Sequence, residues 1–448
     1  MSGLRYTIVW LFGAGLMAGA VFAAEPQGLS GENPNPIHLI RRPVAPLSAM
    51  AKLGREIFFD TSLSSSGKMS CASCHSPDHA YGPPNDGPVM LGGATLTLSG
   101  ARAVPSLTYL DRQPDFGIGP DDRESEDVNL ADKAALGQTA TRVEKTATQT
   151  AQSAANMVPQ GGLFWDGRAD TLQMQAAGPL LDPREMDGGS TEIIAEKLRH
   201  APYANKFVGL FGERIFRDTK LLLTEALFAI GRYQIEEPSF HPYTSKYDHW
   251  LEGKSRLTES EMRGYRLFND PDKANCAGCH SSQPTRDGRP PLFTDFQYEA
   301  LGGPRNLALS DTKDPNYFDL GICGPIRKDM ADQPQFCGMF KTPTLRNTAV
   351  RRVFFHNGVF QTLQQVMDFY NFRDTNPEKV YPLDADGKAQ KYNDIPAQYH
   401  ANVDVSDPPF NRHLGDVPAM TAQDEADIIE FLKTLNDGYE PDRHASPN

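Results

Sequence analysis

Hydrophobic residues recur with the spacing of amphipathic helices in several separate segments of the chain. The helical spacing covers residues 50–59, 191–211, 220–235, 257–268 and 421–435. Alternation of the kind that predicts β-strands is scarce. The whole chain contains 38 Gly and 35 Pro, many of them in long stretches between these segments. The pattern predicts an all-α protein with long loops and few strands.

The first apolar segment, residues 6–24, has the features of a secretory signal peptide. It follows Arg5 and ends in small residues that suit cleavage near Ala23. A permanent membrane anchor is the alternative, because the segment is nearly long enough to span a bilayer. No comparable apolar run occurs later in the sequence. We therefore expect residues 1–24 to be removed and the mature protein to act in the periplasm without contacting a membrane.

The chain of 448 residues is long enough for two or three domains with their own hydrophobic cores. Its 57 Asp and Glu outnumber its 44 Lys and Arg, which gives a formal net charge of -13. This sign opposes binding to the polyanionic backbone of a nucleic acid, so we expect no such partner. Residues 113–160 are polar, first acidic and then rich in Ala and Thr, which predicts a surface insertion.

Four of the six cysteines belong to two copies of a Cys-x-x-Cys-His pentapeptide. Two thiols three positions apart lie on one side of a helical turn, so both can attach to one porphyrin. The next residue then presents its imidazole to the iron. Zinc sites also use paired Cys-x-x-Cys, but a His directly after each pair and the wide separation of the pairs argue against zinc. The sequence predicts two covalently bound haem c groups, at Cys71-Ala72-Ser73-Cys74-His75 and Cys276-Ala277-Gly278-Cys279-His280.

Each haem motif follows one of the predicted helices, at residues 50–59 and 257–268. The chain therefore carries an internal duplication, in which each copy is a small helical unit completed by its porphyrin. We expect two cytochrome c-like haem domains, an N-terminal one at residues 25–250 that contains the insertion and a C-terminal one at residues 251–448.

The remaining cysteines, Cys323 and Cys337, bracket a short loop that contains Pro and Gly. In an exported protein, a local disulfide between them is the simplest account.

Two haems do not by themselves distinguish an electron carrier from an enzyme. A carrier holds both irons on both faces, whereas a peroxidase leaves one axial position open beneath an acid/base group. Near the first haem the other candidate ligand is His79, one turn after His75, and it cannot readily reach the opposite face of the same porphyrin. We expect His79 to be a surface or propionate-side residue.

An ordered set of further motifs resembles the bacterial dihaem cytochrome c peroxidases, and within them the MauG-like branch. The motifs are Leu53-Gly54-Arg55-Glu56-Ile57-Phe58-Phe59-Asp60, Phe164-Trp165-Asp166-Gly167-Arg168-Ala169, Gln175-Ala176-Ala177-Gly178-Pro179, Phe340-Lys341-Thr342-Pro343-Thr344-Leu345-Arg346-Asn347 and Phe355-His356-Asn357-Gly358. Together with the haem motifs, this order is far more specific than any one motif.

The resemblance implies that the haem on His75 reacts with hydrogen peroxide beneath Gln175, Pro179 and Glu185. A carboxylate above an open iron can move a peroxide proton from the near to the far oxygen, so Glu185 is the candidate acid/base. The alternative is that Glu185 belongs to a solvated loop. The resemblance also makes Trp165 the side chain through which electrons pass between the haems, which is compatible with a buried core position.

After His356, the residues Leu363, Val366, Met367 and Tyr370 share one helical face, so either Met367 or Tyr370 could meet the second iron. The resemblance favours Tyr370, because MauG-like members carry Tyr where ordinary peroxidases of the family carry Met. A phenolate oxygen favours ferric and higher iron states, whereas a thioether favours ferrous iron. The alternative is a core position for Tyr370 with Met367 as the ligand.

The resemblance therefore implies a peroxide-dependent dihaem oxidoreductase that passes oxidising equivalents from the first haem to the second. In a MauG-like reaction the reductant is a side chain of a partner protein. In an ordinary, detoxifying cytochrome c peroxidase it is a periplasmic cytochrome c or cupredoxin. A third alternative is a non-enzymatic dihaem electron-transfer cytochrome.

The resemblance also implies a calcium ion between the haems, bound in part by an Asn in a Gly-x-Arg-Asn segment. This chain instead reads Gly100-Ala101-Arg102-Ala103, and Arg351 and Val353 replace the Thr and Pro expected before Phe-His-Asp-Gly. These departures argue against calcium, although the ion stays an open alternative. We hypothesise that Arg351 or Arg352 supplies the missing positive charge.

Overall fold

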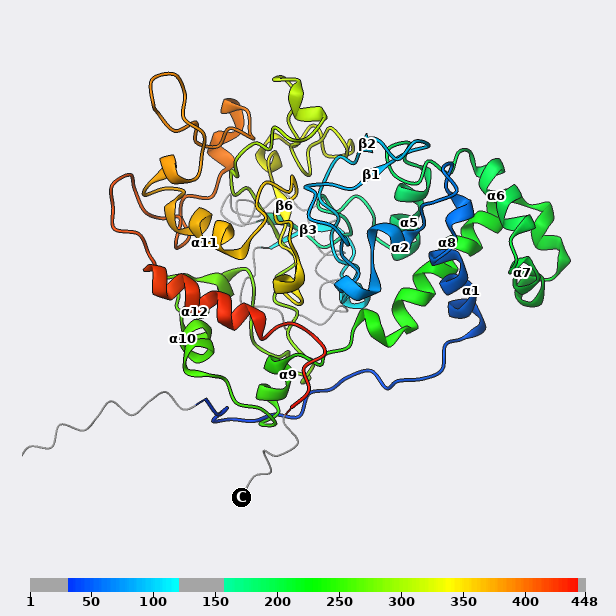
Figure 1. Ribbon diagram of the computed structural model, residues 1–448, viewed down its shortest axis with the longest axis horizontal. Coiled ribbons are helices and arrows are strands. Elements are labelled where there is room, and N and C mark those ends of the chain that lie inside the picture. Colours follow the sequence, from blue (N-terminus) through cyan, green and yellow to red (C-terminus); the bar gives the residue numbers. More distant parts are fainter. Residues whose placement is uncertain (1–30, 121–156, 442–448) are drawn as a thin grey trace, which may run out of the picture.

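The computed structural model describes residues 31–120 and 157–441, and within them helices joined by long loops dominate (Figure 1). The helices are α1 (Ala49–Phe58), α2 (Cys71–Cys74), α5 (Leu172–Leu181), α6 (Thr191–His200), α7 (Ala204–Phe211), α8 (Thr219–Glu236), α9 (Lys246–Leu251), α10 (Glu259–Phe268), α11 (Leu363–Phe372) and α12 (Ala422–Lys433). The strands form three short antiparallel pairs, β1 (Leu91–Gly92) with β2 (Leu98–Ser99), β3 (Gly117–Pro120) with β4 (Met157–Gln160), and β5 (Tyr298–Glu299) with β6 (Phe340–Lys341). The prediction of a mostly helical protein with few strands is confirmed.

The five segments with helical spacing all contain helices, although the structure differs from the prediction in the helix count of one segment and in helices, such as α5 and α9, that were not predicted. Residues 191–211 form two helices, α6 and α7, separated at Pro202, which lacks the N–H that a continuous helix needs. Helix α5 was not predicted, because Gly178 and Pro179 lie inside it. The predicted signal peptide and most of the predicted insertion lie outside the described residues.

The first hydrophobic core forms where α1 crosses α8, on the right of Figure 1. Ser48 caps α1 by accepting a hydrogen bond from the N–H of Ala51. Gly54 allows the two helices to approach closely, because a Cβ atom there would lie 1.8 Å from the carbonyl oxygen of Ala229. The apolar faces of both helices are buried, including Leu53, Ile57, Phe58, Leu222, Ala226 and Ile230.

The second core repeats this arrangement with α10 and α12. Thr258 and Glu261 form a capping box at the start of α10. Gly264 is the sixth residue of α10, as Gly54 is the sixth of α1, and a Cβ atom there would lie 1.9 Å from the carbonyl oxygen of Asp427. Phe268 and Phe431 are fully buried between the helices. The matching helix pairs support the internal duplication that the two haem motifs indicate.

The first described residues pack against the second core before the chain continues into α1, which belongs to the first core. Residues 31–41 run beneath α9 in Figure 1, and Leu39 is buried in the second core. The backbone N–H of Ile37 donates to the carbonyl oxygen of Leu251 at 2.9 Å. The indole N–H of Trp250 donates to the carbonyl oxygen of Gly31 at 3.0 Å. These bonds satisfy backbone groups of an extended segment that has no strand partner.

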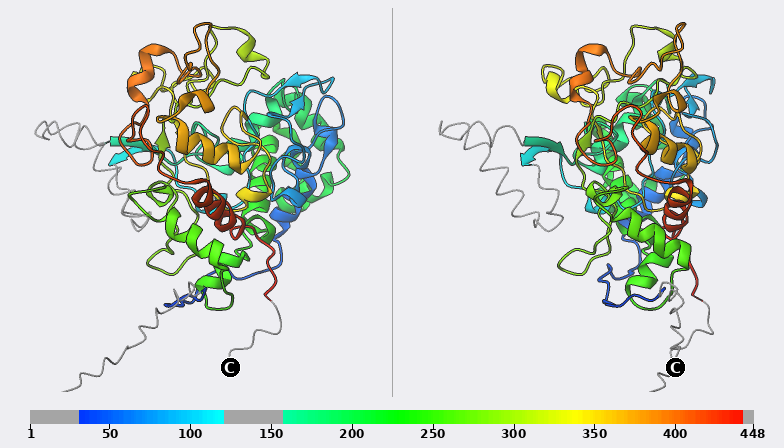
Figure 2. Two further views of the ribbon diagram at one scale, coloured as in Figure 1. Left: turned by 60° about the vertical axis from the view of Figure 1, so that its left-hand side comes forward. Right: turned by 90° about the vertical axis from the view of Figure 1, so that its left-hand side faces the viewer.

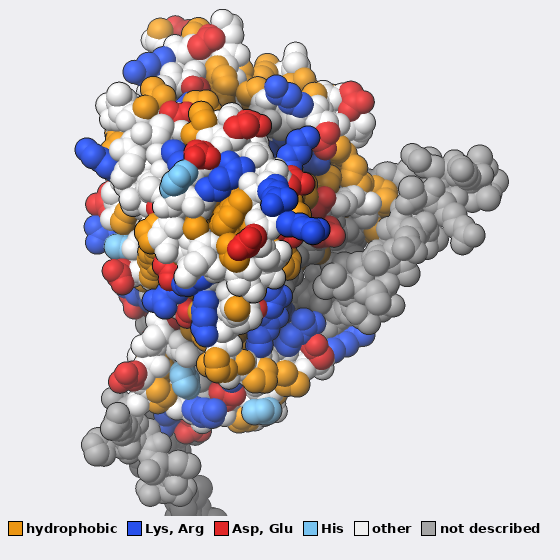
Figure 3. Space-filling model, turned by 90° about the vertical axis from the view of Figure 1, so that its right-hand side faces the viewer, with side chains coloured by type: hydrophobic (Ala, Val, Ile, Leu, Met, Phe, Trp, Pro, Cys, Tyr) orange, Lys and Arg blue, Asp and Glu red, His pale blue; other side chains and the backbone are white. Residues whose placement is uncertain are grey.

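Strands β3 and β4 project from the body of the molecule (Figure 2), and residues 121–156 connect them. Lysines and arginines gather in groups on the face that carries the first core (Figure 3). Some of these cations pair with acids, as Lys206 does with Glu56 at 2.7 Å. Within the described part of the chain, no helix has the length and apolar character needed to cross a membrane.

Candidate functional site

The first Cys-x-x-Cys-His motif forms α2 and its C-cap. Cys71 and Cys74 are the first and last residues of α2, and His75 follows them. The Nδ1 atom of His75 lies 3.0 Å from the carbonyl oxygen of Tyr81, which leaves Nε2 for a metal. Burial lowers the pKa of His75 to about 4, so the imidazole is neutral at pH 7 and offers a lone pair. The residues present therefore fit a haem iron.

The second motif holds its histidine in the same way. Cys276 opens a short 3₁₀ turn, and Nδ1 of His280 lies 2.8 Å from the carbonyl oxygen of Phe293. Burial lowers the pKa of His280 to about 4 as well. The two acceptor residues, Tyr81 and Phe293, both have the positive φ values of left-handed backbone, 52° and 54°. Both imidazoles are therefore oriented by an equivalent turn of the chain.

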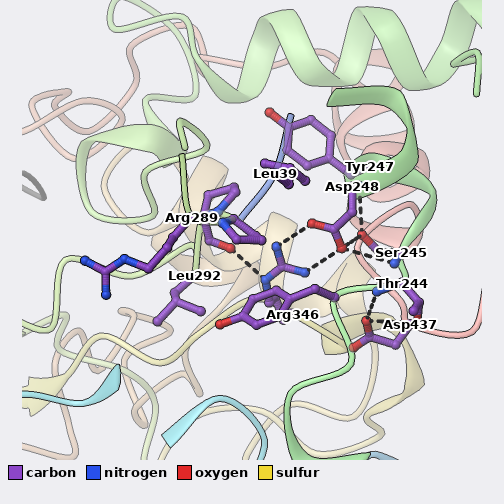
Figure 4. Close-up of polar contacts among 12 residues, drawn as sticks. Leu39, Thr244, Ser245, Tyr247, Asp248, Arg289, Leu292, Arg346 and Asp437 are labelled. Carbon is purple, nitrogen blue, oxygen red and sulfur yellow. Dashed lines mark hydrogen bonds and ion pairs between the residues drawn. The ribbon is translucent and has the colours of Figure 1, made fainter. Parts of the chain in front are cut away.

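A fully buried ion pair supports the loop that orients His280 (Figure 4). Arg346 donates to both carboxylate oxygens of Asp248, at 2.8 and 2.9 Å. Its Nε donates to the carbonyl oxygen of Pro291 at 2.6 Å, two residues before Phe293. Arg346 thus ties the segment before Phe293 to Asp248 of α9, and removing one partner of this buried pair would leave an uncompensated charge.

A cavity at the second motif is lined by Cys276, Cys279 and His280, and by both candidate ligands of α11, Met367 and Tyr370. Met367 is 6% exposed and packs in the second core. Burial raises the pKa of the Tyr370 phenol, and the nearby thiols of Cys279 and Cys276 raise it further. A buried phenol of this kind ionises only beside a compensating positive charge, such as that of ferric iron.

The phenol ring of Tyr370 is part of an aromatic stack. Its centroid lies 5.3 Å from that of Phe410, with 24° between the ring planes. The guanidinium carbon of Arg373 lies 3.7 Å from the centroid of the Phe410 ring. Arg373 is fully buried and also donates to the carbonyl oxygen of Leu301 at 2.9 Å. The stack fixes the plane of the Tyr370 ring.

The residues proposed to roof the first haem come from α5 and the turn after it. Gln175 and Pro179 lie on α5, and Gln175 is 7% exposed. The carbonyl oxygen of Glu185 accepts a hydrogen bond from the N–H of Gly93 at 2.8 Å. A Cβ atom on Gly92 would lie 2.6 Å from the same oxygen, so only glycine allows β1 to pack against this turn.

The Glu185 carboxyl has the acidity of a group that can both give and take a proton at neutral pH. Burial, and to a smaller extent the charge of Asp182, raise its pKa to about 7 against the opposing effects of Arg168 and Arg184. Its charge in turn raises the pKa of Cys74, after the larger effect of burial. Glu185 therefore lies close enough to the first haem motif for its charge to be felt there.

His79 does not approach the cavity. It is exposed, and its Nδ1 lies 3.1 Å from the hydroxyl oxygen of Ser76. This agrees with a surface position.

Trp165 lies between segments of both halves of the chain. Its indole N–H donates to the carbonyl oxygen of Ala103 at 2.8 Å, and its own carbonyl accepts from the N–H of Lys341 at 2.9 Å. The N–H of Ala103 donates to the carbonyl oxygen of His356 at 2.8 Å. Trp165 lines the same cavity as Gln175 and the second haem motif.

A buried charge network lies directly after Trp165. Arg102 donates to Asp166 at 2.7 Å and to Asp319 at 2.6 Å. The carbonyl oxygen of Asp166 accepts from Arg327 at 2.7 Å. Asp319 precedes, and Arg327 lies within, the loop closed by the disulfide between Cys323 and Cys337, which is present as predicted. The disulfide loop thus reaches the region next to Trp165.

Three buried or half-buried polar residues of the cavity received no firm role from the sequence. Lys341 donates to the carbonyl oxygen of Gly162 at 2.7 Å, and burial lowers its pKa to about 7. The ring of His356 stacks on Phe340 with centroids 3.5 Å apart. Arg351 lines the cavity beside them. The sequence could have drawn attention to all three, because they lie within or next to the motifs that carry the family resemblance.

The duplication extends to the helices that face the two haem motifs. Phe164 and Phe355 both have φ 66°, and each begins the turn that leads to the N-cap of α5 or α11. The eighth residue of α5 is Pro179, and the eighth residue of α11 is Tyr370. The two halves therefore carry a residue without a ligating side chain and a phenol at equivalent positions.

Comparison with known proteins finds similarity over most of the chain. Residues 48–256 match the family model described as di-haem cytochrome c peroxidase. The chain is 31% identical to the methylamine utilization protein MauG of Paracoccus denitrificans, over 75% of this chain and 78% of MauG. It is 30% identical to the cytochrome c551 peroxidase of Nitrosomonas europaea, over 79% of this chain and 81% of that protein.

Among solved structures, the diheme peroxidase BthA of Burkholderia thailandensis matches with a TM-score of 0.73 and 33% identity. The match covers 92% of this chain and 95% of BthA.

Proposed function

We propose that this chain, which belongs to the di-haem cytochrome c peroxidase family, reduces hydrogen peroxide at a haem on His75 and draws the electrons through a second haem on His280 and Tyr370. The family makes the chain a peroxide-dependent dihaem oxidoreductase with MauG-like relatives. The assignment of residues to roles is our proposal. Cys71, Cys74, Cys276 and Cys279 would attach the two porphyrins through thioether bonds.

The observation that carries the proposal is the difference at the eighth residue of the paired helices α5 and α11. The Pro179 side chain has no atom that can bind iron, so the haem on His75 would keep an open face. Tyr370 offers a phenol oxygen, so the haem on His280 would be closed. When bound, an open haem iron supplies the site where peroxide binds and its O–O bond breaks.

Glu185 would move the proton in the first half. Its carboxylate would take a proton from one oxygen of hydrogen peroxide and return it to the other oxygen, which would leave as water. A pKa of about 7 makes both transfers accessible at neutral pH. Complete reduction of one peroxide takes two electrons and two protons and gives two molecules of water. The buried Gln175 would orient the oxygen atoms by hydrogen bonding.

Trp165 would carry electrons between the two haems. Its side chain lines the cavity that reaches Cys276 and His280, and the hydrogen bond to Ala103 fixes the indole. In the second half, both Met367 and Tyr370 line the cavity and contact the second core, and the stack on Phe410, which fixes the ring of Tyr370, is the observation that favours the tyrosine as the ligand.

We further propose two haem domains, at residues 25–250 and 251–448, and a periplasmic location after removal of residues 1–24. The Cys323–Cys337 disulfide supports an oxidising compartment. For the reductant we favour a MauG-like protein substrate, because a hard oxygen ligand at the second haem suits storage of oxidising rather than reducing equivalents. An ordinary peroxidase that takes electrons from a cytochrome c or a cupredoxin is the second candidate, favoured by the cytochrome c551 peroxidase relative.

The deciding experiment mixes peroxide with the fully ferric holoprotein in a stopped-flow spectrometer. We expect the absorption bands of both haems to change without prior reduction. Tyr370→Met should abolish this ferric-state reaction and make it depend on prior reduction by one electron, whereas Tyr265→Phe, in the second core, should behave like the wild type. A Tyr370→Met protein that still reacts while ferric would contradict the assignment of Tyr370.

Electron paramagnetic resonance of the resting ferric protein tests the open face separately. We expect one high-spin and one low-spin haem. Two low-spin haems would contradict the proposed peroxide site and favour an electron-transfer cytochrome.

A further inference from the structure

Arg351 and Arg352 are neighbours in the sequence but lie in opposite surroundings. The Arg352 side chain is 70% exposed and pairs with Asp86 at 3.2 Å. The guanidinium of Arg351 instead lines the cavity, where its Nη2 donates to the carbonyl oxygens of Val104 at 2.9 Å and Val353 at 3.3 Å. The structure therefore shows which of the two arginines faces the cavity, a question that the sequence left open.

The two carbonyl oxygens that Arg351 binds come from the two segments in which this chain departs from the family. Val104 directly follows Ala103, which stands where the family has its calcium-binding Asn. Val353 stands where the family has Pro. The N–H of Ala103 donates to the carbonyl oxygen of His356 at 2.8 Å, so the two segments are in direct contact. The loss of an Asn and the gain of an Arg therefore occur at one place in the fold.

Arg351 has no acidic partner in the part of the chain that the structure describes, because its hydrogen bonds there go only to backbone carbonyl oxygens. Burial lowers the pKa of the guanidinium to about 10, with no carboxylate opposing the shift, and the group is still cationic at pH 7. A Cβ atom on Gly82, seven residues after His75, would lie 3.4 Å from the Nη1 atom of Arg351. A positive charge thus stands next to the first haem motif.

A calcium ion does not fit this arrangement. Calcium takes six to eight oxygen ligands, usually with carboxylates among them. Nowhere in residues 31–120 and 157–441 do three His, Cys, Asp or Glu side chains gather in a way that could hold a metal ion. Ala103 offers only a methyl group, and the carbonyl oxygens of Val104 and Val353 already accept hydrogen bonds from Arg351.

We propose that the Arg351 guanidinium is a built-in cation that takes the place of a bound metal ion between the two halves of the molecule. It joins the segment at Val104, next to the contact of Trp165, to the segment at Val353, which leads to α11. The holoprotein therefore needs no calcium to hold these segments together.

The first test is metal analysis of the holoprotein by mass spectrometry after purification in calcium-containing buffer. We expect haem iron at two atoms per chain and calcium far below one. Treatment with EDTA should leave the melting temperature and the ferric spectra unchanged. Stoichiometric calcium, or a loss of melting temperature on EDTA treatment that calcium restores, would overturn the proposal.

The second test measures the charge itself. Arg351→Gln removes a positive charge near His75, so the reduction potential of the haem held by His75 should fall. Arg351→Lys keeps the charge and should stay near the wild-type potential. The matched control is Arg352→Gln, which removes an exposed charge that solvent screens. Equal potentials in Arg351→Gln and Arg352→Gln would overturn the proposal.

The third test replaces the arginine site with residues that could bind calcium. Ala103→Asn combined with Arg351→Thr restores the family residues at both positions and frees the two carbonyl oxygens. We expect calcium to raise the melting temperature of this double variant and to be retained on gel filtration, while the wild type responds to neither. A wild type that gains as much from calcium as the double variant would contradict the built-in cation.

Discussion

The two halves of the molecule use one framework for opposite purposes. Each half has a capped helix with Gly at its sixth position, a Cys-x-x-Cys-His motif and a His whose Nδ1 faces a backbone carbonyl. They diverge at the eighth residue of the facing helix, where Pro179 stands in α5 and Tyr370 in α11. The comparison teaches that one framework orients both histidines, and that under the proposed assignment a single residue on the facing helix would decide whether the iron stays accessible.

The residues around α5 and α11 differ in a way that matches the difference between Pro179 and Tyr370. The turn after α5 carries Glu185, whose pKa is raised to about 7 by burial. After α11 the chain instead supplies Phe410 and Arg373, which stack in line with Tyr370. One half therefore provides a buried carboxyl group suited to the proposed proton transfer, and the other provides a rigid support for the proposed tyrosine ligand.

The largest effect is expected from copying the second half into the first. Pro179→Tyr would place a phenol at the position that Tyr370 has in α11, so it should close the open iron. We expect the high-spin ferric signal to disappear and the peroxide reaction to slow by at least about 100-fold, because a six-coordinate iron must lose a ligand before it reacts. Stopped-flow kinetics and electron paramagnetic resonance measure both. Pro179→Ala, which adds no ligand, should keep the high-spin signal; a high-spin Pro179→Tyr protein would break the comparison.

Removing the acid/base group comes next. Glu185→Gln should slow the peroxide reaction by about 10²–10⁴-fold, because the amide cannot accept the peroxide proton. In the wild type the rate should rise as pH increases through about 7, since the ionised carboxylate is the base, and this dependence should vanish in the variant. Glu196→Gln, on the exposed face of α6, serves as the control. An unchanged pH profile in Glu185→Gln would assign the proton transfer to another group.

A smaller effect concerns the disulfide loop, which belongs to the second half but reaches the network beside Trp165. Replacing Cys323 and Cys337 with Ser should destabilise the protein by about 2–4 kcal/mol, chiefly by relaxing the constraint on the unfolded chain. Denaturant unfolding measures this loss. The rate of peroxide reaction at low temperature should change little, because Glu185 and Gln175 lie in the other half. A fall in that rate as large as that of Glu185→Gln would mean that the loop acts directly on the first haem.

The smallest effect is expected from the support of Tyr370. Phe410→Leu removes an aromatic contact worth about 0.5–1.5 kcal/mol, so Tyr370 should stay bound but lose its fixed ring plane. The low-spin ferric signal should broaden, while the high-spin signal of the first haem stays sharp. Phe372→Leu, on the same helix as Tyr370, is the control. Identical spectra in Phe410→Leu and the wild type would show that the stack does not orient the ligand.

Local pattern was sufficient to predict the helices whose apolar faces recur regularly, among them α1, α8 and α12. It failed for α5, because Gly178 and Pro179 oppose helix formation and the tertiary contacts with α8 outweigh that preference. The disulfide could be predicted because both cysteines lie in one short loop and the chain carries export features. The network of Arg102, Asp166 and Asp319 could not, because its members are far apart in the sequence.

The sequence by itself determined the two Cys-x-x-Cys-His motifs, the duplication and the resemblance to a family, because each of these is written in adjacent residues. Only the tertiary structure decided that Pro179 and Tyr370 are equivalent and that Arg351 rather than Arg352 is enclosed between the halves. The physical reason is that local spacing fixes which side of a helix or turn a residue occupies. What that side faces depends on segments that meet only when the chain has folded.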